Sequence, residues 1–205
     1  HRAPRLIQNS ANSPAAEAAI KDERMMSMEF EKIGSAGLVV RGLLSAVECQ
    51  QLIQLAEDQG FVAAAVRTPD GQKSMPLVRN NQRTLLASPE WVALLWARLC
   101  ALPLPVLDGQ SAVGLPKDLR FYKYDPGERF KMHKDGPWHE DGQSSKLTAL
   151  FYLNDGYEGG ETVFRDATVV PETGMLLLFE HPNWHEGTAL TAGTKYVMRS
   201  DVMYA

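Results

Sequence analysis

The chain has 205 residues, a formal net charge of −4 and a pI of about 5.8, with 44% hydrophobic and 22% charged residues. This composition is ordinary for a globular protein and excludes disordered and fibrous classes. Lys and Arg are not in excess, so a sequence-independent nucleic-acid partner has no electrostatic basis. No segment approaches the roughly 20 apolar residues that cross a membrane, so no membrane partner is expected.

The cysteine content bears on the compartment. Cys49 and Cys100 are too few for a disulfide framework and lack a C-x-x-C metal spacing. We therefore predict reduced thiols and a cytoplasmic location. Because the chain begins at His1 rather than at a methionine, it is interpreted as trimmed or tagged, and a signal peptide is not judged from it. The sequence makes no prediction of oligomeric state.

The N-terminal segment, residues 1–35, is rich in Ala, Ser, Asn and charged residues. It is interpreted as an extension outside the core, either flexible or helical from Pro14 to Glu23. The ordered fold is expected to begin at the apolar, mainly β-branched segment 38–40, which predicts a short strand.

Two helices are predicted next along the chain, and together they indicate a supporting layer. The first begins at a capping box formed by Ser45 and Glu48 and ends at Gly60. The second begins at Ser88-Pro89-Glu90, with Ser as the N-cap and Pro in the first turn, and stops before Pro103.

After Gly114 the hydrophobic period changes to two, which is typical of β-strands. Short strands separated by turns indicate a jelly roll. The predicted fold class is therefore α+β, mainly β: one domain over 36–205, with helical support at about 36–115 and a double-stranded β-helix (jelly-roll) core at about 116–205. The predicted strands cover residues 119–124, 130–135, 146–153, 161–164, 175–179 and 195–203.

The first candidate site lies in the predicted strand 130–135. Alternate side chains of a strand point to the same face, so His133 and Asp135 should project together, with Lys134 on the other face. A neutral imidazole and a carboxylate on one face are two thirds of the facial triad that binds non-haem Fe(II).

The third ligand should be another histidine, on a different strand that faces the same cavity. We predict His185, because it opens an extended stretch just beyond the buried strand 175–179. His181 is the competing candidate, but it lies in a turn, where a surface or capping role is expected and its removal should be nearly silent. His139 lies in the loop 136–145 and is interpreted in the same way.

Several segments resemble the prolyl 4-hydroxylase-like branch of the Fe(II)- and 2-oxoglutarate-dependent dioxygenases. Residues 124–135 (YDPGERFKMHKD) resemble the family's first iron-binding strand pair. Residues 150–155 (LFYLND) with 158–162 (EGGET) are similar to its next hairpin, and 185–187 (HEG) with Lys195 to its closing strands. The motifs follow one another in the family's order across about residues 119–204.

The resemblance implies roles for individual residues. His133, Asp135 and His185 would bind the iron, and Lys195 would pair with the C5 carboxylate of 2-oxoglutarate, where many relatives carry an arginine. Physical reasoning agrees, because an inward lysine is costly unless an anion neutralises it; a solvated lysine at a strand edge is the alternative. Tyr124 and Tyr152 would line the co-substrate pocket, with a purely packing role as their alternative.

Arg199 follows Lys195 by four residues and lies on the same strand face as Asp201. Two roles fit this position. Arg199 would contact the substrate or the C1 end of the co-substrate, or it would form a structural ion pair with Asp201.

The implied reaction is hydroxylation of an unactivated C–H bond with Fe(II), 2-oxoglutarate and O2, with ascorbate as an additional reductant. Asp135 favours hydroxylation, because related halogenases carry Ala or Gly there. The expected target is a prolyl residue in a peptide or protein; a free amino acid or small metabolite is the alternative. Loops 66–81 and 136–145 are expected to select it. Two interpretations from other classes remain: a jelly-roll metal-binding module without redox turnover, which would not need Lys195, and a zinc hydrolase.

Overall fold

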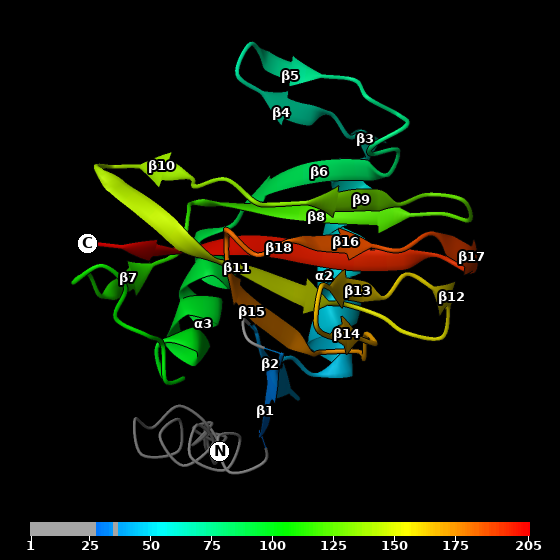
Figure 1. Cartoon of the computed structure of the whole chain (residues 1–205). Helices are drawn as coiled ribbons and strands as arrows, with labels where there is room; N and C mark the ends of the chain where they lie inside the picture. Colours follow the sequence, from blue (N-terminus) through cyan, green and yellow to red (C-terminus); the bar gives the residue numbers. More distant parts are fainter. Residues whose placement is uncertain (1–27, 35–36) are drawn as a thin grey trace, which may run out of the picture.

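Antiparallel β-strands dominate the computed structural model, which describes residues 28–34 and 37–205 (Figure 1). The largest sheet follows the order β1-β2-β15-β11-β18-β8-β6-β3, with β10 attached to β11 and β7 to β18. Its strands are β1 (Glu29–Ile33), β2 (Gly37–Arg41), β3 (Val62–Ala63), β6 (Gln82–Ala87), β7 (Ala112–Gly114), β8 (Asp118–Tyr124), β10 (His139–Glu140), β11 (Gln143–Tyr152), β15 (Leu176–Glu180) and β18 (Lys195–Tyr204).

A second, smaller sheet has the order β14-β13-β16-β9. Side chains of both sheets meet in one apolar cluster, to which β2 and β18 contribute Val39 and Val197 and β13 contributes Phe164. Two sheets packed in this way form the double-stranded β-helix, and the predicted fold class is confirmed. The strands of the smaller sheet are β9 (Phe130–His133), β13 (Thr162–Phe164), β14 (Thr168–Val169) and β16 (His185–Gly187); β4 (Val66–Thr68) pairs with β5 (Gly71–Lys73), and β12 (Glu158–Gly159) with β17 (Leu190–Ala192).

Strand β15 shows why this fold needs apolar runs without polar alternation. Leu176 and Leu178 pack into the cluster on the helix side of the large sheet. Leu177 and Phe179 point the other way, into the cluster between the sheets. Because both faces of the strand are buried, successive residues are all apolar.

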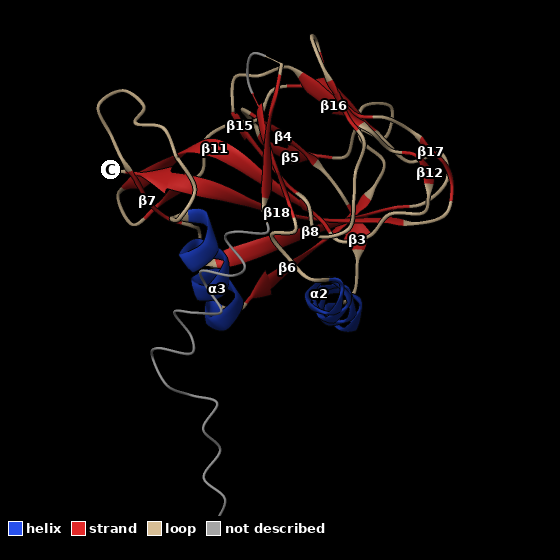
Figure 2. Ribbon diagram, turned by 90° about the horizontal axis from the view of Figure 1, so that it is seen from below, coloured by secondary structure: helices blue, strands red, loops and turns tan. Residues whose placement is uncertain are grey.

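Both predicted helices are present, and both lie on the same side of the large sheet (Figure 2). Helix α2 (Ala46–Gln59) begins with the predicted capping box: the Ser45 hydroxyl accepts from the Glu48 amide, and the Glu48 carboxylate accepts from the Ser45 amide. Helix α3 (Pro89–Leu99) is capped by Ser88. Their apolar faces pack on the sheet, as expected for a supporting layer. Within the described residues, no helix is long and apolar enough to cross a membrane.

The structure differs from the sequence interpretation near the N-terminus. Residues 29–33, assigned to an extension outside the core, form the edge strand β1 paired with β2. Met28, only 8% exposed, packs into the main apolar cluster. The segment 36–115 likewise contributes strands to the large sheet and is not only a helical support. The helix predicted from Pro14 to Glu23 lies outside the described residues.

Candidate active site

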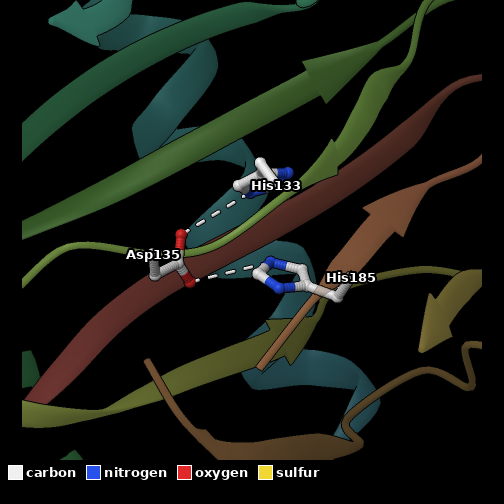
Figure 3. A group of neighbouring side chains, drawn as sticks. All are labelled: His133, Asp135 and His185. Carbon is white, nitrogen blue, oxygen red and sulfur yellow. Dashed lines mark ion pairs between the residues drawn. The ribbon is translucent and has the colours of Figure 1, made fainter. Parts of the chain in front are cut away.

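Three predicted metal ligands converge in the space between the two sheets (Figure 3). His133 ends β9 and His185 opens β16, and these two residues are paired directly across the strands. The Nε2 atom of His133 lies 3.6 Å from Asp135 Oδ1, and the Nε2 atom of His185 lies 3.7 Å from Asp135 Oδ2. All three ligand atoms lie within 4.8 Å of one another, so a single ion could contact them all.

Both imidazoles are held with Nε2 directed into the site. His133 Nδ1 lies 2.7 Å from the Lys131 carbonyl oxygen, and His185 Nδ1 lies 3.0 Å from the Asn183 carbonyl oxygen. A carbonyl only accepts, so Nδ1 carries the proton and Nε2 keeps its lone pair. Burial lowers the pKa of His185 to about 4, which keeps this ring neutral near pH 7. Fixed tautomers of this kind are typical of metal-binding histidines.

Asp135 reaches the site by a different route from the one predicted. Strand β9 ends at His133, so Asp135 is not part of a strand. Its position is set instead by a backbone hydrogen bond, in which the Asp135 amide donates to the His181 carbonyl at 3.1 Å. The two side chains still face the same cavity, as strand alternation predicted, but a tertiary contact is responsible.

The carboxylate of Asp135 is ionised and hydrogen-bonded at both oxygens. Arg199 Nη1 donates to Oδ1 and the Thr148 hydroxyl donates to Oδ2, each at 2.7 Å. Burial alone would raise the pKa of Asp135, but the Arg199 guanidinium and the imidazoles of His133 and His185 hold it well below its usual range. The site therefore offers a metal one carboxylate oxygen donor and two imidazole nitrogens.

Arg199 forms the ion-pair arrangement that was one of its two expected roles. Besides Asp135, it contacts Asp201, with Nη2 at 3.1 Å from Oδ1. Asp201 is completely buried and also pairs with Arg120 of the neighbouring strand β8. The four charges compensate one another, which makes their burial tolerable. The guanidinium lines the cavity, so contact with a substrate is compatible with this ion pair.

Lys195 opens β18 at the other end of the same cavity. It is 3% exposed, and Nζ donates to the carbonyl oxygen of Gly160. The ring centroids of Tyr124 and Tyr152 lie 5.3 and 5.5 Å from Nζ. Burial lowers the pKa of Lys195 to about 7, opposed by the more distant Glu161 carboxylate. A buried ammonium with so little compensation is a ready site for an anion.

The glycine pair in the EGG segment allows this close approach. Gly160 has a φ of +74°, which side chains other than glycine rarely adopt. A Cβ atom there would lie 2.7 Å from Leu190 Cδ1 and 3.2 Å from Lys195 Cδ. Glycine at this position therefore lets the lysine side chain run along the backbone to its carbonyl.

The structure brings together all seven residues that the sequence analysis assigned to the site. One cavity is lined by all of them: His133, Asp135, His185, Lys195, Tyr124, Tyr152 and Arg199. The hydroxyl of Tyr152 lies 2.6 Å from that of Thr162, which lines the same cavity. His139 is exposed on β10, as expected for a residue without a site role.

The interpretation of His181 was wrong. It is not a surface or capping residue: it is 5% exposed, and both ring nitrogens are hydrogen-bonded, to Ser145 and to Thr148. Thr148 in turn contacts Asp135. The sequence analysis missed Ser145 and Thr148 as well. Only the clustering of His181 with His185 in one short segment was a usable signal, and it was interpreted as competition for one role.

Comparison with known proteins finds similarity to one superfamily. A sequence profile of the 2OG-Fe(II) oxygenase superfamily matches residues 119–200, the segment that carries every residue assigned to the site. This segment of the chain is therefore similar to that superfamily. A PKHD-type hydroxylase of Klebsiella pneumoniae is 31% identical over 134 residues, which is 58% of this chain and 58% of the relative. The chain thus spans less than two thirds of that relative's length.

Solved structures share the overall fold of this chain. A viral collagen prolyl hydroxylase of Paramecium Bursaria Chlorella virus-1, solved with 2-oxoglutarate, has a TM-score of 0.62 at 21% identity, covering 83% of this chain and 97% of that one. A prolyl hydroxylase of Trichoplax adhaerens, solved with a hypoxia inducible factor peptide fragment, has a TM-score of 0.64 at 18% identity and covers 93% of each chain. The profile match and the His133-Asp135-His185 cluster together imply Fe(II), 2-oxoglutarate and O2; the involvement of ascorbate stays a prediction.

Proposed function

We propose that the chain is an Fe(II)- and 2-oxoglutarate-dependent hydroxylase that acts on an unactivated C–H bond. One observation carries this proposal: a preformed His133-Asp135-His185 ligand set and the buried ammonium of Lys195 share a single cavity. A passive metal-binding module has no use for a buried lysine that forms no ion pair within the described residues, because desolvation of such a charge is costly. A dicarboxylate that spans the metal and Lys195 explains both features.

The residues present fit the implied metal and co-substrate. Two neutral imidazoles and one carboxylate are the donors that non-haem Fe(II) takes, with positions left open for other ligands. The metal, when bound, would supply the oxidative decarboxylation of 2-oxoglutarate and the oxidising power for hydroxylation. Lys195 would pair with the C5 carboxylate, beside Tyr124 and Tyr152. The apolar walls of Leu150 and Val197, which line the cavity, would exclude water.

As substrate we propose a prolyl residue in a peptide or protein. The proposal is supported by the peptide and collagen hydroxylases among the structural relatives, the Trichoplax enzyme being solved with a peptide fragment. We also retain the proposal of a cytoplasmic location, which is supported by the two free cysteines, Cys49 and Cys100.

The test is a turnover assay of the purified chain with 2-oxoglutarate, Fe(II) and panels of prolyl peptides and free amino acids. We expect succinate to form only when Fe(II) and O2 are both present, and a prolyl peptide to gain one oxygen atom. If only a free amino acid is oxygenated, the substrate is a small metabolite and not a peptide. Hydrolysis that continues without O2 would instead support the zinc-hydrolase interpretation.

The pKa of Lys195 predicts how 2-oxoglutarate binding depends on pH. In the protein without 2-oxoglutarate, Lys195 has a pKa of about 7, and a carboxylate bound beside it would raise this pKa. Binding above pH 7 therefore requires proton uptake, so the apparent affinity should fall by up to about tenfold per pH unit. Burial raises the pKa of Tyr124 to about 12 and that of Tyr152 further, so neither phenol titrates in this range.

Calorimetry between pH 6.5 and about 9, with Mn(II) held at saturation in place of Fe(II), measures this dependence. Lys195→Arg is the matched control, because arginine stays charged throughout. Its affinity should be lower but nearly independent of pH. A parent affinity that does not change over the range would contradict the assignment of Lys195.

A further inference from the structure

A continuous chain of hydrogen bonds leads away from Asp135 on the side opposite Arg199. The Thr148 hydroxyl lies 2.7 Å from Asp135 Oδ2, and His181 Nδ1 lies 2.9 Å from the Thr148 hydroxyl. The Ser145 hydroxyl lies 2.7 Å from His181 Nε2, and the Trp138 amide donates to that hydroxyl at 2.8 Å. The proposed mechanism uses none of the three residues Ser145, Thr148 and His181.

This series of hydrogen bonds depends on an irregularity in β11. Residues three apart on a regular strand point to opposite faces, so Ser145 and Thr148 could not contact one ring. The pairing of β11 with β18 shifts between Ser145 and Leu147, which is a β-bulge. The extra residue turns Ser145 to the face of Thr148, and the imidazole of His181 bridges the two hydroxyls. Bulges beside active sites often redirect a side chain in this way.

Only one placement of the hydrogen atoms gives every hydrogen bond in this series a donor and an acceptor. An ionised carboxylate only accepts, so the single hydroxyl hydrogen of Thr148 goes to Asp135. Thr148 must then accept from His181, which places the imidazole proton on Nδ1. Nε2 is left as an acceptor for Ser145, which itself accepts from the Trp138 amide. The planar ring of His181 holds a donor, Nδ1, and an acceptor, Nε2, in fixed positions. An aliphatic side chain would supply neither.

The backbone of His181 also ties the site together. Its carbonyl accepts from the Asp135 amide, and its amide donates to the Lys146 carbonyl, both at 3.1 Å. His185 follows four residues later on β16. Residue 181 therefore contacts the segment that carries Asp135 directly and lies in the segment that leads to His185.

We infer that His181 is a positioning residue for the metal centre, acting through Thr148 on the Asp135 carboxylate. With Thr148 on Oδ2 and Arg199 on Oδ1, the carboxylate is held at both oxygens and faces the space that it shares with the two imidazole Nε2 atoms, where a metal would bind. The inference rests on the proposed metal site. Partners of this kind contribute to metal affinity although they never touch the metal.

Mn(II) titration calorimetry of the full chain without O2 tests the inference, together with the visible spectrum of bound Co(II). His181→Leu and Thr148→Val should each weaken Mn(II) binding about 10–100-fold and shift the Co(II) spectrum. His181→Asn keeps an amide donor near the Nδ1 position and should recover most of the loss. His181→Gln places its amide near Nε2, away from Thr148, and should recover less. His139→Leu, at an exposed histidine, is the matched control and should change nothing.

The outcomes separate positioning from packing. If the role of His181 were purely structural, the Asn and Gln variants would both have lower melting temperatures, and their Mn(II) affinities would not differ. If His181→Leu fails to fold, Thr148→Val and the Asn and Gln pair decide the question. Parental Mn(II) affinity in Thr148→Val, or equal affinity of the Asn and Gln variants, would overturn the inference alone. A parent chain that binds no Mn(II) would overturn the proposed metal centre, and the inference with it.

Discussion

Replacing Lys195 by methionine is expected to lower 2-oxoglutarate affinity roughly 10²–10³-fold while making the protein more stable. The loss follows from removing one partner of a buried ion pair, which costs about 3–5 kcal/mol. The gain follows from the low pKa of Lys195, about 7, which shows that the folded protein disfavours the ammonium. At pH 7 the methionine variant should gain on the order of 2–4 kcal/mol in free energy of unfolding.

The pH dependence of this stability gain can be worked out. The pKa of Lys195 is about 7 in the folded protein and about 10.5 when unfolded. Between these values the unfolded chain binds more protons, so the stability of the parent rises with pH. Below pH 7 both states are protonated and the difference is constant. The advantage of Lys195→Met should therefore be largest at or below pH 7 and shrink toward pH 10.5.

Denaturant unfolding across this pH range, with calorimetry of 2-oxoglutarate binding, measures both effects. Lys123→Met is a suitable control, because Lys123 lies on the adjacent strand β8 but pairs with Glu57 of α2 on the helix side of the sheet. It should leave co-substrate affinity unchanged. If Lys195→Met binds 2-oxoglutarate as well as the parent does, Lys195 is not the co-substrate anchor and the metal-binding module becomes the better interpretation.

Removing the Asp135 carboxylate should abolish both metal binding and 2-oxoglutarate turnover. Asp135→Ala deletes one of three ligands and also leaves Arg199 with Asp201 as its remaining partner. We expect metal affinity to fall by more than about 100-fold, since loss of an outer hydrogen-bond partner alone can reach that value. Asp135→Asn keeps the shape and should lose metal affinity with a smaller cost in stability. His133→Ala should behave like Asp135→Ala.

Metal titration, succinate formation and melting temperature together decide this prediction. Far-ultraviolet circular dichroism should show the strands intact, because the large sheet is held by clusters that do not include the three ligands. Turnover that persists in both Asp135→Ala and His133→Ala would show that the ligands are misassigned. His139→Ala, remote from the cavity, should retain parental activity.

How far local pattern could predict the site is clearest at Asp135. Its spacing from His133 suggested a shared strand face, and the two side chains do share the cavity. The strand nevertheless ends at His133, and the amide of Asp135 is held by His181, 46 positions further along the chain. The prediction reached the right residues because the motif is short and local. The interactions that hold Asp135 involve distant segments, which no local pattern describes.

The sequence by itself determined the features that depend on neighbouring residues. The capping box of the first helix, the helix ends, the period-two strands and the His-x-Asp pair all follow from local spacing, and His185 from its place just beyond the buried strand 175–179. The resemblance of the same segments to a known family then supplied the roles of Lys195, Tyr124 and Tyr152. Only the tertiary structure decided that β1 joins the sheet, that Arg199 neutralises Asp135, and that a bulge in β11 turns Ser145 toward His181. Strand alternation says which side chains share a face, but the register between distant strands says which of them meet, and register is decided by packing of the whole sheet.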